Sequence, residues 1–123
     1  MTAPSVSILR RGQIVLVSLD PAMVSEARKA RPAVLVSNNT ANAQAMRSPR
    51  ATVTIVPLTS KTDRVLPFQV LLPAAATGLD RDSKAQAEQV RTAAVSRIVR
   101  PVGWMPAELM GALDEALRLH LAL

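Results

Sequence analysis

QIVLVSL at residues 13–19 and AVLVS at residues 33–37 are the two stretches that decide the fold of this chain. Both consist mainly of β-branched residues and leucine, and Gly12 and the pair Asp20-Pro21 bound the first of them. This composition between turn residues predicts β-strands. Because the second stretch is nearly all apolar, we expect a strand buried on both faces, at the centre of a sheet.

Further strands are predicted downstream. Residues 52–58 (TVTIVPL) alternate up to Pro57, where we expect pairing to end because proline cannot donate to a ladder. Residues 37–50 are rich in Asn, Ser and Ala and are predicted to form a long loop. Three more strand candidates follow, at residues 68–72, the weaker 84–91, and 98–102.

In the last segment the spacing of apolar residues changes from that of a strand to that of a helix. Pro106 suits a first helical turn, with Glu108 near the positive end of the helix dipole. Apolar residues then recur at helical spacing: Leu109, Leu113, Ala116, Leu117 and Leu121. Short strands followed by one amphipathic helix predict a mainly β fold, a small, strongly bent barrel with a C-terminal α-helix.

The length of 123 residues suits one domain spanning 1–123, with residues 1–9 as an N-terminal extension. Apolar residues make up 49% of the chain, enough to bury a core. The only aromatic residues besides His120 are Phe68 and Trp104. So few large side chains in a small barrel predict that dimerisation covers part of its surface.

The composition excludes several kinds of chemistry. The chain has no cysteine, which excludes disulfides, thiolate nucleophiles and cysteine-ligated zinc. Its single histidine, His120, excludes a site built on two imidazoles, and its place beside the apolar helix face favours a structural role. The chemistry that remains rests on arginine, hydroxyl, carboxylate or amide groups, and we expect neither a cofactor nor a metal.

We expect no targeting signal in this sequence. Residues 1–9 carry no positive charge ahead of their apolar residues, unlike a signal peptide. No stretch approaches the roughly 18 apolar residues of a membrane helix. We therefore expect a cytoplasmic protein with no membrane partner.

The positive charge is unevenly distributed. The net charge is +6, and 12 of the 15 basic residues are arginine, which favours planar, bidentate partners such as phosphate. Residues 1–100 carry a net charge of +8, whereas residues 101–123 carry −2. A polyanion is therefore expected to meet the body of the domain and not its C-terminal helix.

Two segments next to predicted strands carry groups suited to phosphate. SEARKARP at residues 25–32 places four charged side chains just before the second strand: Glu26, Arg28, Lys29 and Arg31. Pro32 biases Arg31 toward extended geometry, which places a fixed cation where it can bind phosphate. The alternative interpretation of the segment is an ordinary charged loop. Thr59, Ser60 and Lys61 follow the third strand and can bind phosphate or a 2′-hydroxyl, with a capped turn as the alternative.

Two weaker candidates follow. Asp80 and Asp82 lack a third ligand at useful spacing, so a solvated turn is the better interpretation than a metal site. Within Glu88-Gln89-Val90-Arg91, strand alternation places Gln89 and Arg91 on one face. A glutamine amide reads base edges well, but such a pair is common on any sheet.

The order of these pieces resembles the MazF/PemK family of toxin endoribonucleases. The matching pieces are Arg11-Gly12-Gln13-Ile14-Val15, Leu19-Asp20-Pro21, Ser25-Glu26, Arg31-Pro32-Ala33-Val34, Val56-Pro57-Leu58-Thr59-Ser60, Phe68-Gln69-Val70, Gly78-Leu79 with Asp82-Ser83, and Glu88-Gln89-Val90-Arg91-Thr92. Each piece is weakly specific, but the ordered set is highly specific and covers nearly the whole chain.

The resemblance implies an SH3-like barrel of the CcdB/MazF type, a homodimer, and single-stranded RNA bound along the dimer groove. The family's catalytic arginine falls on Arg31 and its catalytic threonine on Thr59. It also implies a cognate MazE-like antitoxin with a flexible acidic tail. The expected RNA contacts are Ser25, Arg28, Lys29, Ser60, Lys61, Glu88, Gln89 and Arg91.

The implied reaction is a metal-independent, sequence-specific cleavage in which the 2′-hydroxyl of RNA displaces the adjacent 5′-oxygen. Arg31 stabilises the charge that gathers on the phosphate oxygens, and Thr59 orients the phosphate with support from Ser60. Glu26 is the candidate base that takes the 2′-hydroxyl proton.

Two alternatives stay open. One is a non-catalytic RNA- or antitoxin-binding module on the same barrel, because Val24, Ala27 and Ala30 stand where the family usually has Gly, Gln and Gly. The other is a gyrase poison of the CcdB type. That alternative is disfavoured because such proteins end in Trp-Gly-Ile, whereas this chain ends in His120-Leu121-Ala122-Leu123.

Overall fold

The computed structural model describes residues 8–18 and 30–123. Within them, short strands precede a long C-terminal helix, as the sequence predicted. In chain order the elements are β1 (Gln13–Ser18), β2 (Ala30–Leu35), α2 (Asn39–Ala45), β3 (Thr52–Thr59), β4 (Gln69–Leu72), α3 (Ala74–Thr77), β5 (Ser83–Gln86), η1 (Ala87–Gln89), β6 (Arg91–Ala94), η2 (Val95–Arg97), β7 (Ile98–Trp104) and α4 (Ala107–Leu121).

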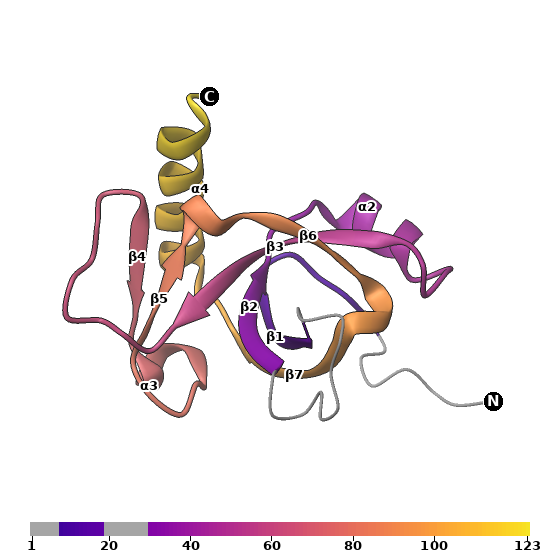
Figure 1. The fold of residues 1–123 in the computed structure, drawn as a ribbon, viewed down its shortest axis with the longest axis horizontal. Coiled ribbons are helices and arrows are strands. Elements are labelled where there is room, and N and C mark those ends of the chain that lie inside the picture. The colour runs from indigo at the N-terminus through magenta and orange to yellow at the C-terminus, as the bar shows by residue number, and fades with distance from the viewer. Residues whose placement is uncertain (1–7, 19–29) are drawn as a thin grey trace.

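The strands form an antiparallel sheet in the order β4-β5-β3-β2-β1-β7, and β6 pairs with β3 off this path. Figure 1 shows β3 crossing from the curved group of β1, β2 and β7 to the group of β4 and β5. The predicted mainly β fold with a C-terminal helix is confirmed. In the described part of the chain no ladder joins β7 to β4 or β6, so the sheet is bent but not closed into a barrel.

The centre of the sheet is covered on both faces. In β2, Ala33, Val34 and Leu35 are all fully buried, which confirms the prediction for this apolar strand. Ala33 and Leu35 pack into a core cluster with Val15 and Val17, whereas Val34 packs into a second cluster with Ile14. Because neighbouring residues of a strand point to opposite faces, the two clusters lie on the two sides of one sheet.

The prediction that pairing ends at Pro57 is wrong. Pro57 is the last residue of β3 that pairs with β2, opposite Ala33. The strand then continues, and Leu58 and Thr59 pair with Ala85 and Lys84 of β5. The missing N–H of the proline therefore marks a change of partner strand and not the end of the strand.

Residues 37–50, predicted to be a loop, contain the helix α2. The side-chain oxygen of Asn38 accepts a hydrogen bond from the Ala41 N–H at 2.8 Å and caps the helix. Asn42 is fully buried, and its amide donates to the Ser37 carbonyl oxygen at 2.9 Å. These asparagines, which are typical of a loop in the sequence, cap the helix and anchor it to the end of β2.

The predicted strand at residues 84–91 is also wrong as a single element. It divides into β5, the 3-10 helix η1 and the start of β6. Gln89 lies in η1 and Arg91 lies in β6, so the two side chains do not share one strand face as predicted. The turn at η1 lets β5 and β6 pair with different parts of β3.

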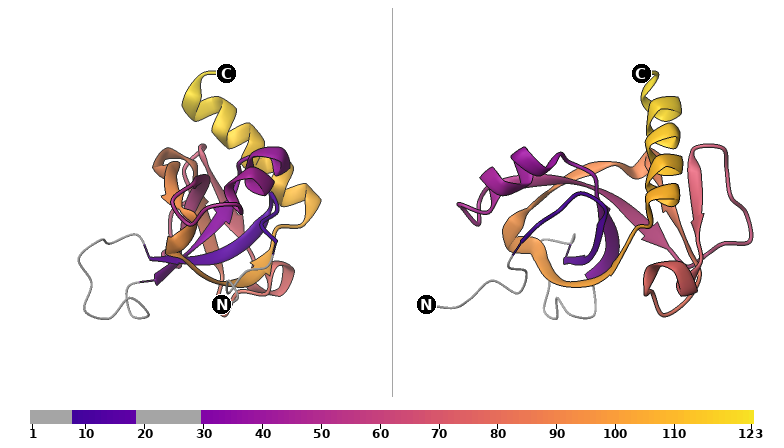
Figure 2. Two further views of the ribbon diagram at one scale, coloured as in Figure 1. Left: turned by 90° about the vertical axis from the view of Figure 1, so that its right-hand side faces the viewer. Right: turned by 180° about the vertical axis from the view of Figure 1, so that it is seen from behind.

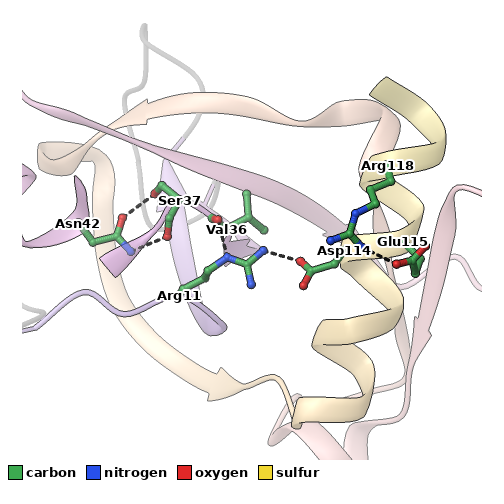
Figure 3. A network of polar contacts seen from close by, with 7 residues as sticks. All are labelled: Arg11, Val36, Ser37, Asn42, Asp114, Glu115 and Arg118. Carbon is green, nitrogen blue, oxygen red and sulfur yellow. Dashed lines mark hydrogen bonds and ion pairs between the residues drawn. The ribbon is translucent and has the colours of Figure 1, made fainter. Parts of the chain in front are cut away.

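The C-terminal helix α4 packs beside β4 and η1 (Figure 2). Its Leu113 and Ala116 are buried, as predicted, but Leu121 is about half exposed. Arg11 fixes the helix to the sheet, because its Nε donates to the Val36 carbonyl oxygen at 2.8 Å and its guanidinium forms an ion pair with Asp114 (Figure 3).

His120 lies on the last turn of α4, and its ring contacts Phe68, with the ring centroids 6.1 Å apart. This contact is consistent with the structural role predicted for the histidine. None of the helices that the structure describes has the length and apolar composition needed to cross a membrane.

Candidate active site

The ladder between β2 and β3 brings Arg31 and Thr59 together. Ala33 pairs with Pro57 in this antiparallel ladder. This pair is the last of the ladder, and Arg31 and Thr59 each lie two residues beyond it on their own strand. Both residues line one cleft of about 720 Å³, so the arginine and threonine singled out by the sequence share a site.

Five parts of the chain form the walls of this cleft. They are Leu16 of β1, the start of β2, the end of β3 with the turn that follows it, the connection between α3 and β5 with the first residue of β5, and β7. The lining residues are Leu16, Arg31, Pro32, Leu58, Thr59, Ser60, Lys61, Gly78, Leu79, Asp80, Arg81, Ser83, Arg100, Pro101, Val102, Gly103 and Trp104.

The turn after β3 fixes the Thr59 hydroxyl. The Thr59 Oγ1 accepts a hydrogen bond from the backbone N–H of Lys61 at 3.3 Å. A hydroxyl that accepts one hydrogen bond keeps its own proton to donate, so Thr59 can donate toward an anion in the cleft. Ser60 and Lys61 are exposed beside it and lie where the sequence analysis expected them.

The cleft is strongly positive. Four cations line it, Arg31, Lys61, Arg81 and Arg100, against a single carboxylate, Asp80. No ion pair between these cations and a carboxylate occurs within residues 8–18 and 30–123. Unpaired guanidinium and ammonium groups facing one hollow can bind phosphate oxygens by charge-assisted hydrogen bonds.

The strand β7 contributes one wall of the cleft through five consecutive residues, 100–104. The side chains of a regular strand alternate between faces, so backbone atoms or redirected side chains must supply part of this wall. The register with β1 shifts between Ile14 and Val15 and again between Leu16 and Val17. These two irregularities bend β7, and bulges of this kind redirect side chains next to binding sites.

Arg81, Arg100 and Trp104 are cleft residues that the sequence analysis did not select. Arg81 stands between the two aspartates that were weighed as a metal pair. Arg100 and Trp104 were seen only as parts of the last strand and of the segment before the helix. Pairing between β1 and β7, which the sequence does not reveal, carries them to the cleft.

Three of the other predicted RNA contacts lie away from the cleft. Glu88, Gln89 and Arg91 do not line the cleft, and one Glu88 oxygen accepts a hydrogen bond from the Gln69 amide at 2.7 Å. Four further predicted site residues fall outside the described residues: Ser25, Glu26, Arg28 and Lys29. In the part of the chain that the structure covers, no group of three or more metal-ligating side chains occurs.

Only Ala30 among the three unusual residues of the first loop is described by the structure. It begins β2 and pairs with Ser18 of β1. Its φ is not positive, since Ala122 is the one described residue besides glycine with a positive φ. Alanine therefore fits this position without backbone strain. Val24 and Ala27 fall outside the described residues.

Residues 10–121 match the family of PemK-like, MazF-like toxins of type II toxin–antitoxin systems. This chain belongs to that family. Among its curated MazF-like relatives, Endoribonuclease MazF9 of Mycobacterium tuberculosis is 55% identical over 116 residues, which are 94% of this chain and 98% of MazF9. Endoribonuclease EndoA of Bacillus subtilis is 32% identical over 117 residues, covering 94% and 97% of the two chains.

Solved structures of MazF toxins have the same fold. The Mycobacterium tuberculosis toxin MazF-mt6 aligns with a TM-score of 0.70 at 24% identity, over 90% of this chain and 97% of that one. A mycobacterial endoribonuclease, solved in complex with its cognate antitoxin, aligns with a TM-score of 0.71 at 23% identity, over 94% and 96% of the chains. The bent, open sheet with its terminal helix is therefore the MazF type of fold.

Gly103 lets the cleft wall formed by β7 approach the end of α3 closely. A Cβ at this position would lie 2.2 Å from the carbonyl oxygen of Thr77, the last residue of α3. Gly78, which follows with a φ of +85°, caps α3 in the left-handed conformation and leads into the cleft wall at residues 79–81. A side chain at Gly103 must push α3 away from β7.

We expect Gly103→Ala to lower the free energy of unfolding by about 1–3 kcal/mol, because the clashing atom is backbone and cannot rotate away. Urea unfolding measures this change. Gly111→Ala is the matched control, since a Cβ there meets nothing within 4 Å, and its stability should stay equal or rise by up to about 1 kcal/mol. A Gly103→Ala protein as stable as the wild type would contradict the close approach.

Proposed function

We propose that this MazF-like toxin is an endoribonuclease that cleaves single-stranded RNA at a phosphodiester bound between Arg31 and Thr59. The observation that carries the proposal is that both residues line one positively charged cleft. The names of the relatives MazF9 and EndoA, both endoribonucleases, support the same activity.

The proposed reaction uses the RNA's own 2′-oxygen as the nucleophile. It loses its proton to a base and attacks the adjacent phosphorus, and the bond to the 5′-oxygen breaks. Arg31 passes a proton to the departing 5′-oxygen, so the products are a 2′,3′-cyclic phosphate and a 5′-hydroxyl. Negative charge gathers on the non-bridging oxygens in the transition state. The guanidinium of Arg31 stabilises this charge, and preorganised donors of this kind contribute roughly 3–4 kcal/mol in other enzymes.

Thr59 orients the scissile phosphate. Its oxygen is held by the Lys61 N–H at 3.3 Å, which leaves the hydroxyl proton to donate to a phosphate oxygen. Ser60, exposed at the same cleft, supports this contact. Glu26 remains our candidate for the base that takes the 2′-hydroxyl proton, and it lies outside the described residues.

We further propose a homodimer and a cognate MazE-like antitoxin as partners. Leu119, Leu121 and Leu123 at the end of the chain are 48–84% exposed, and a second copy would cover such apolar surface. The cationic cleft suits an acidic antitoxin tail, and one mycobacterial neighbour was solved in complex with its cognate antitoxin. We also propose that residues 1–123 form one domain, with residues 1–9 as an extension. The protein acts in the cytoplasm and has no membrane partner.

The test is cleavage of a mixed-sequence single-stranded RNA in excess EDTA. We expect cleavage to continue, because Arg31 and not a metal carries the charge stabilisation. Mass spectrometry of the fragments should find cyclic phosphate and 5′-hydroxyl ends, and a 2′-deoxy substitution at the cut should stop the reaction. Dependence on Mg²⁺, or fragments with 5′-phosphate ends, would contradict the mechanism, and RNA binding without turnover would favour the non-catalytic module.

A further inference from the structure

The single tryptophan of the chain, Trp104, is half exposed at the cleft. Its side chain is 50% accessible although it is one of the largest apolar groups in the protein. Phe68 is the one phenylalanine of the chain, which has no tyrosine, and it packs against the His120 ring. An exposed indole in a hollow lined by cations is an arrangement suited to a ligand that is both flat and anionic.

The backbone under Trp104 is held firmly. Trp104 is the last residue of β7 and pairs with Gln13 of β1. The next residue, Met105, donates its N–H to the Gly12 carbonyl oxygen at 2.8 Å and is itself buried. Gly103, on the other side, lies in close contact with the end of α3. The indole is therefore presented by a rigid segment and not by a mobile loop.

Arg100 adds a cation to the same wall. It pairs with Leu16 of β1, whereas Arg31 pairs with the next residue, Val17, from the opposite side. Strands in a sheet lie about 4.8 Å apart, so the backbones of β2 and β7 are separated by roughly 10 Å across β1. The register shift between Leu16 and Val17 lies between the two arginines, and both line the cleft, so they can contact different phosphates of one strand.

We propose that Trp104 is a stacking platform for an unpaired RNA base and that Arg100 binds a phosphate next to that base. The β7 wall then extends the RNA site beyond the scissile phosphate at Arg31 and Thr59. This inference rests on the proposed function for the identity of the ligand. Base stacking on an aromatic ring is tolerant of sequence, so this wall adds affinity for single strands in general.

Tryptophan fluorescence tests the stacking directly, because the chain has one tryptophan and no tyrosine. The probe is a mixed-sequence 2′-fluoro RNA of about ten nucleotides, a length in the range of single-strand sites, which cannot be cleaved. We expect saturable quenching of the Trp104 emission on titration of the full chain. An oligoglutamate peptide of the same charge can enter the cationic cleft but carries no base, so it should leave the emission nearly unchanged.

Variants separate stacking from general apolar contact. Trp104→Leu should weaken binding of the labelled probe by about fivefold or more, the loss expected when a base loses its aromatic partner, while Trp104→Phe retains most of the affinity. In cleavage of a 2′-hydroxyl RNA, Trp104→Leu should raise KM and leave kcat nearly unchanged, because stacking binds substrate and transition state alike.

The salt dependence of binding tests Arg100. Arg100→Ala should reduce the slope of log Kd against log salt concentration by about 0.7, the value for one phosphate contact on a single strand. Arg50→Ala, which removes an exposed charge outside the cleft, should leave the slope unchanged. An unchanged slope in Arg100→Ala would contradict the phosphate contact.

Several outcomes would overturn the stacking role. RNA binding without quenching of the Trp104 emission would do so, and so would quenching by the peptide alone. An emission that changes only with protein concentration would mean that a second copy of the chain covers Trp104. In each of these cases continued cleavage by the wild type leaves the proposed function intact. Quenching without cleavage of the 2′-hydroxyl RNA would instead confirm the platform and contradict the proposed catalysis.

Discussion

Replacing Arg31 with alanine should lower kcat for RNA cleavage about a hundred- to a thousandfold, the loss seen when one preorganised donor is removed from an enzyme that stabilises an oxyanion. Arg31 is exposed at the cleft, and no described carboxylate pairs with it. Its guanidinium is therefore available to the phosphate, where charge grows in the transition state. Single-turnover cleavage of a mixed-sequence RNA measures the effect.

Two controls make this result specific. Arg31→Lys keeps the charge but loses the planar fork, so it should recover only part of the rate. Arg50→Ala removes an exposed arginine outside the cleft and should cleave at the wild-type rate. Urea unfolding should show Arg31→Ala within about 0.5 kcal/mol of the wild type, as expected for a surface change. Near-wild-type cleavage by Arg31→Ala would place the catalytic cation elsewhere.

Replacing Thr59 with valine should lower kcat about a hundredfold or more, because the change removes the hydroxyl that donates to the phosphate and accepts the Lys61 N–H. Valine keeps the volume and the β-branched shape that suit the end of β3, where Thr59 pairs with Lys84. The same single-turnover assay measures the loss.

Thr59→Ser is the matched control for this variant. Serine keeps an oxygen that can accept the Lys61 N–H and a proton that can be donated to phosphate, so most of the rate should return. If Thr59→Ser is as slow as Thr59→Val, the hydroxyl is not the functional group. Cleavage at the wild-type rate by Thr59→Val would mean the same.

The sequence predicted the parts of the fold that repeat a local pattern. The apolar strand predicted at residues 33–37 and the helical spacing of Leu113 and Ala116 both reflect burial. The helix is observed, and the strand is observed as Ala30–Leu35, three residues earlier at its start and two at its end. The helix α2 could not be found in this way, because its Asn38 cap and buried Asn42 read as loop residues without their partners. The open sheet depends on which strands pair at its edges, and no local pattern encodes that choice.

Only some residues of the site could be predicted from the sequence. Arg31 and Thr59 stand next to strand ends, and the ordered family pieces drew attention to them. Arg81, Arg100 and Trp104 come from distant segments, and their approach depends on the pairing of β1 with β7 and on the close contact at Gly103. Arginine-rich composition indicated an anionic partner, but it could not say which arginines face the same hollow.

The most direct measurement is the single-turnover rate of the double variant Arg31→Ala with Thr59→Val, set beside the two single variants. When two groups bind the same phosphate in one transition state, the effects of removing them are not additive. The double variant should therefore be little slower than the slower single variant. If the two losses instead multiply in full, the arginine and the threonine act independently, and a shared phosphodiester between them is contradicted.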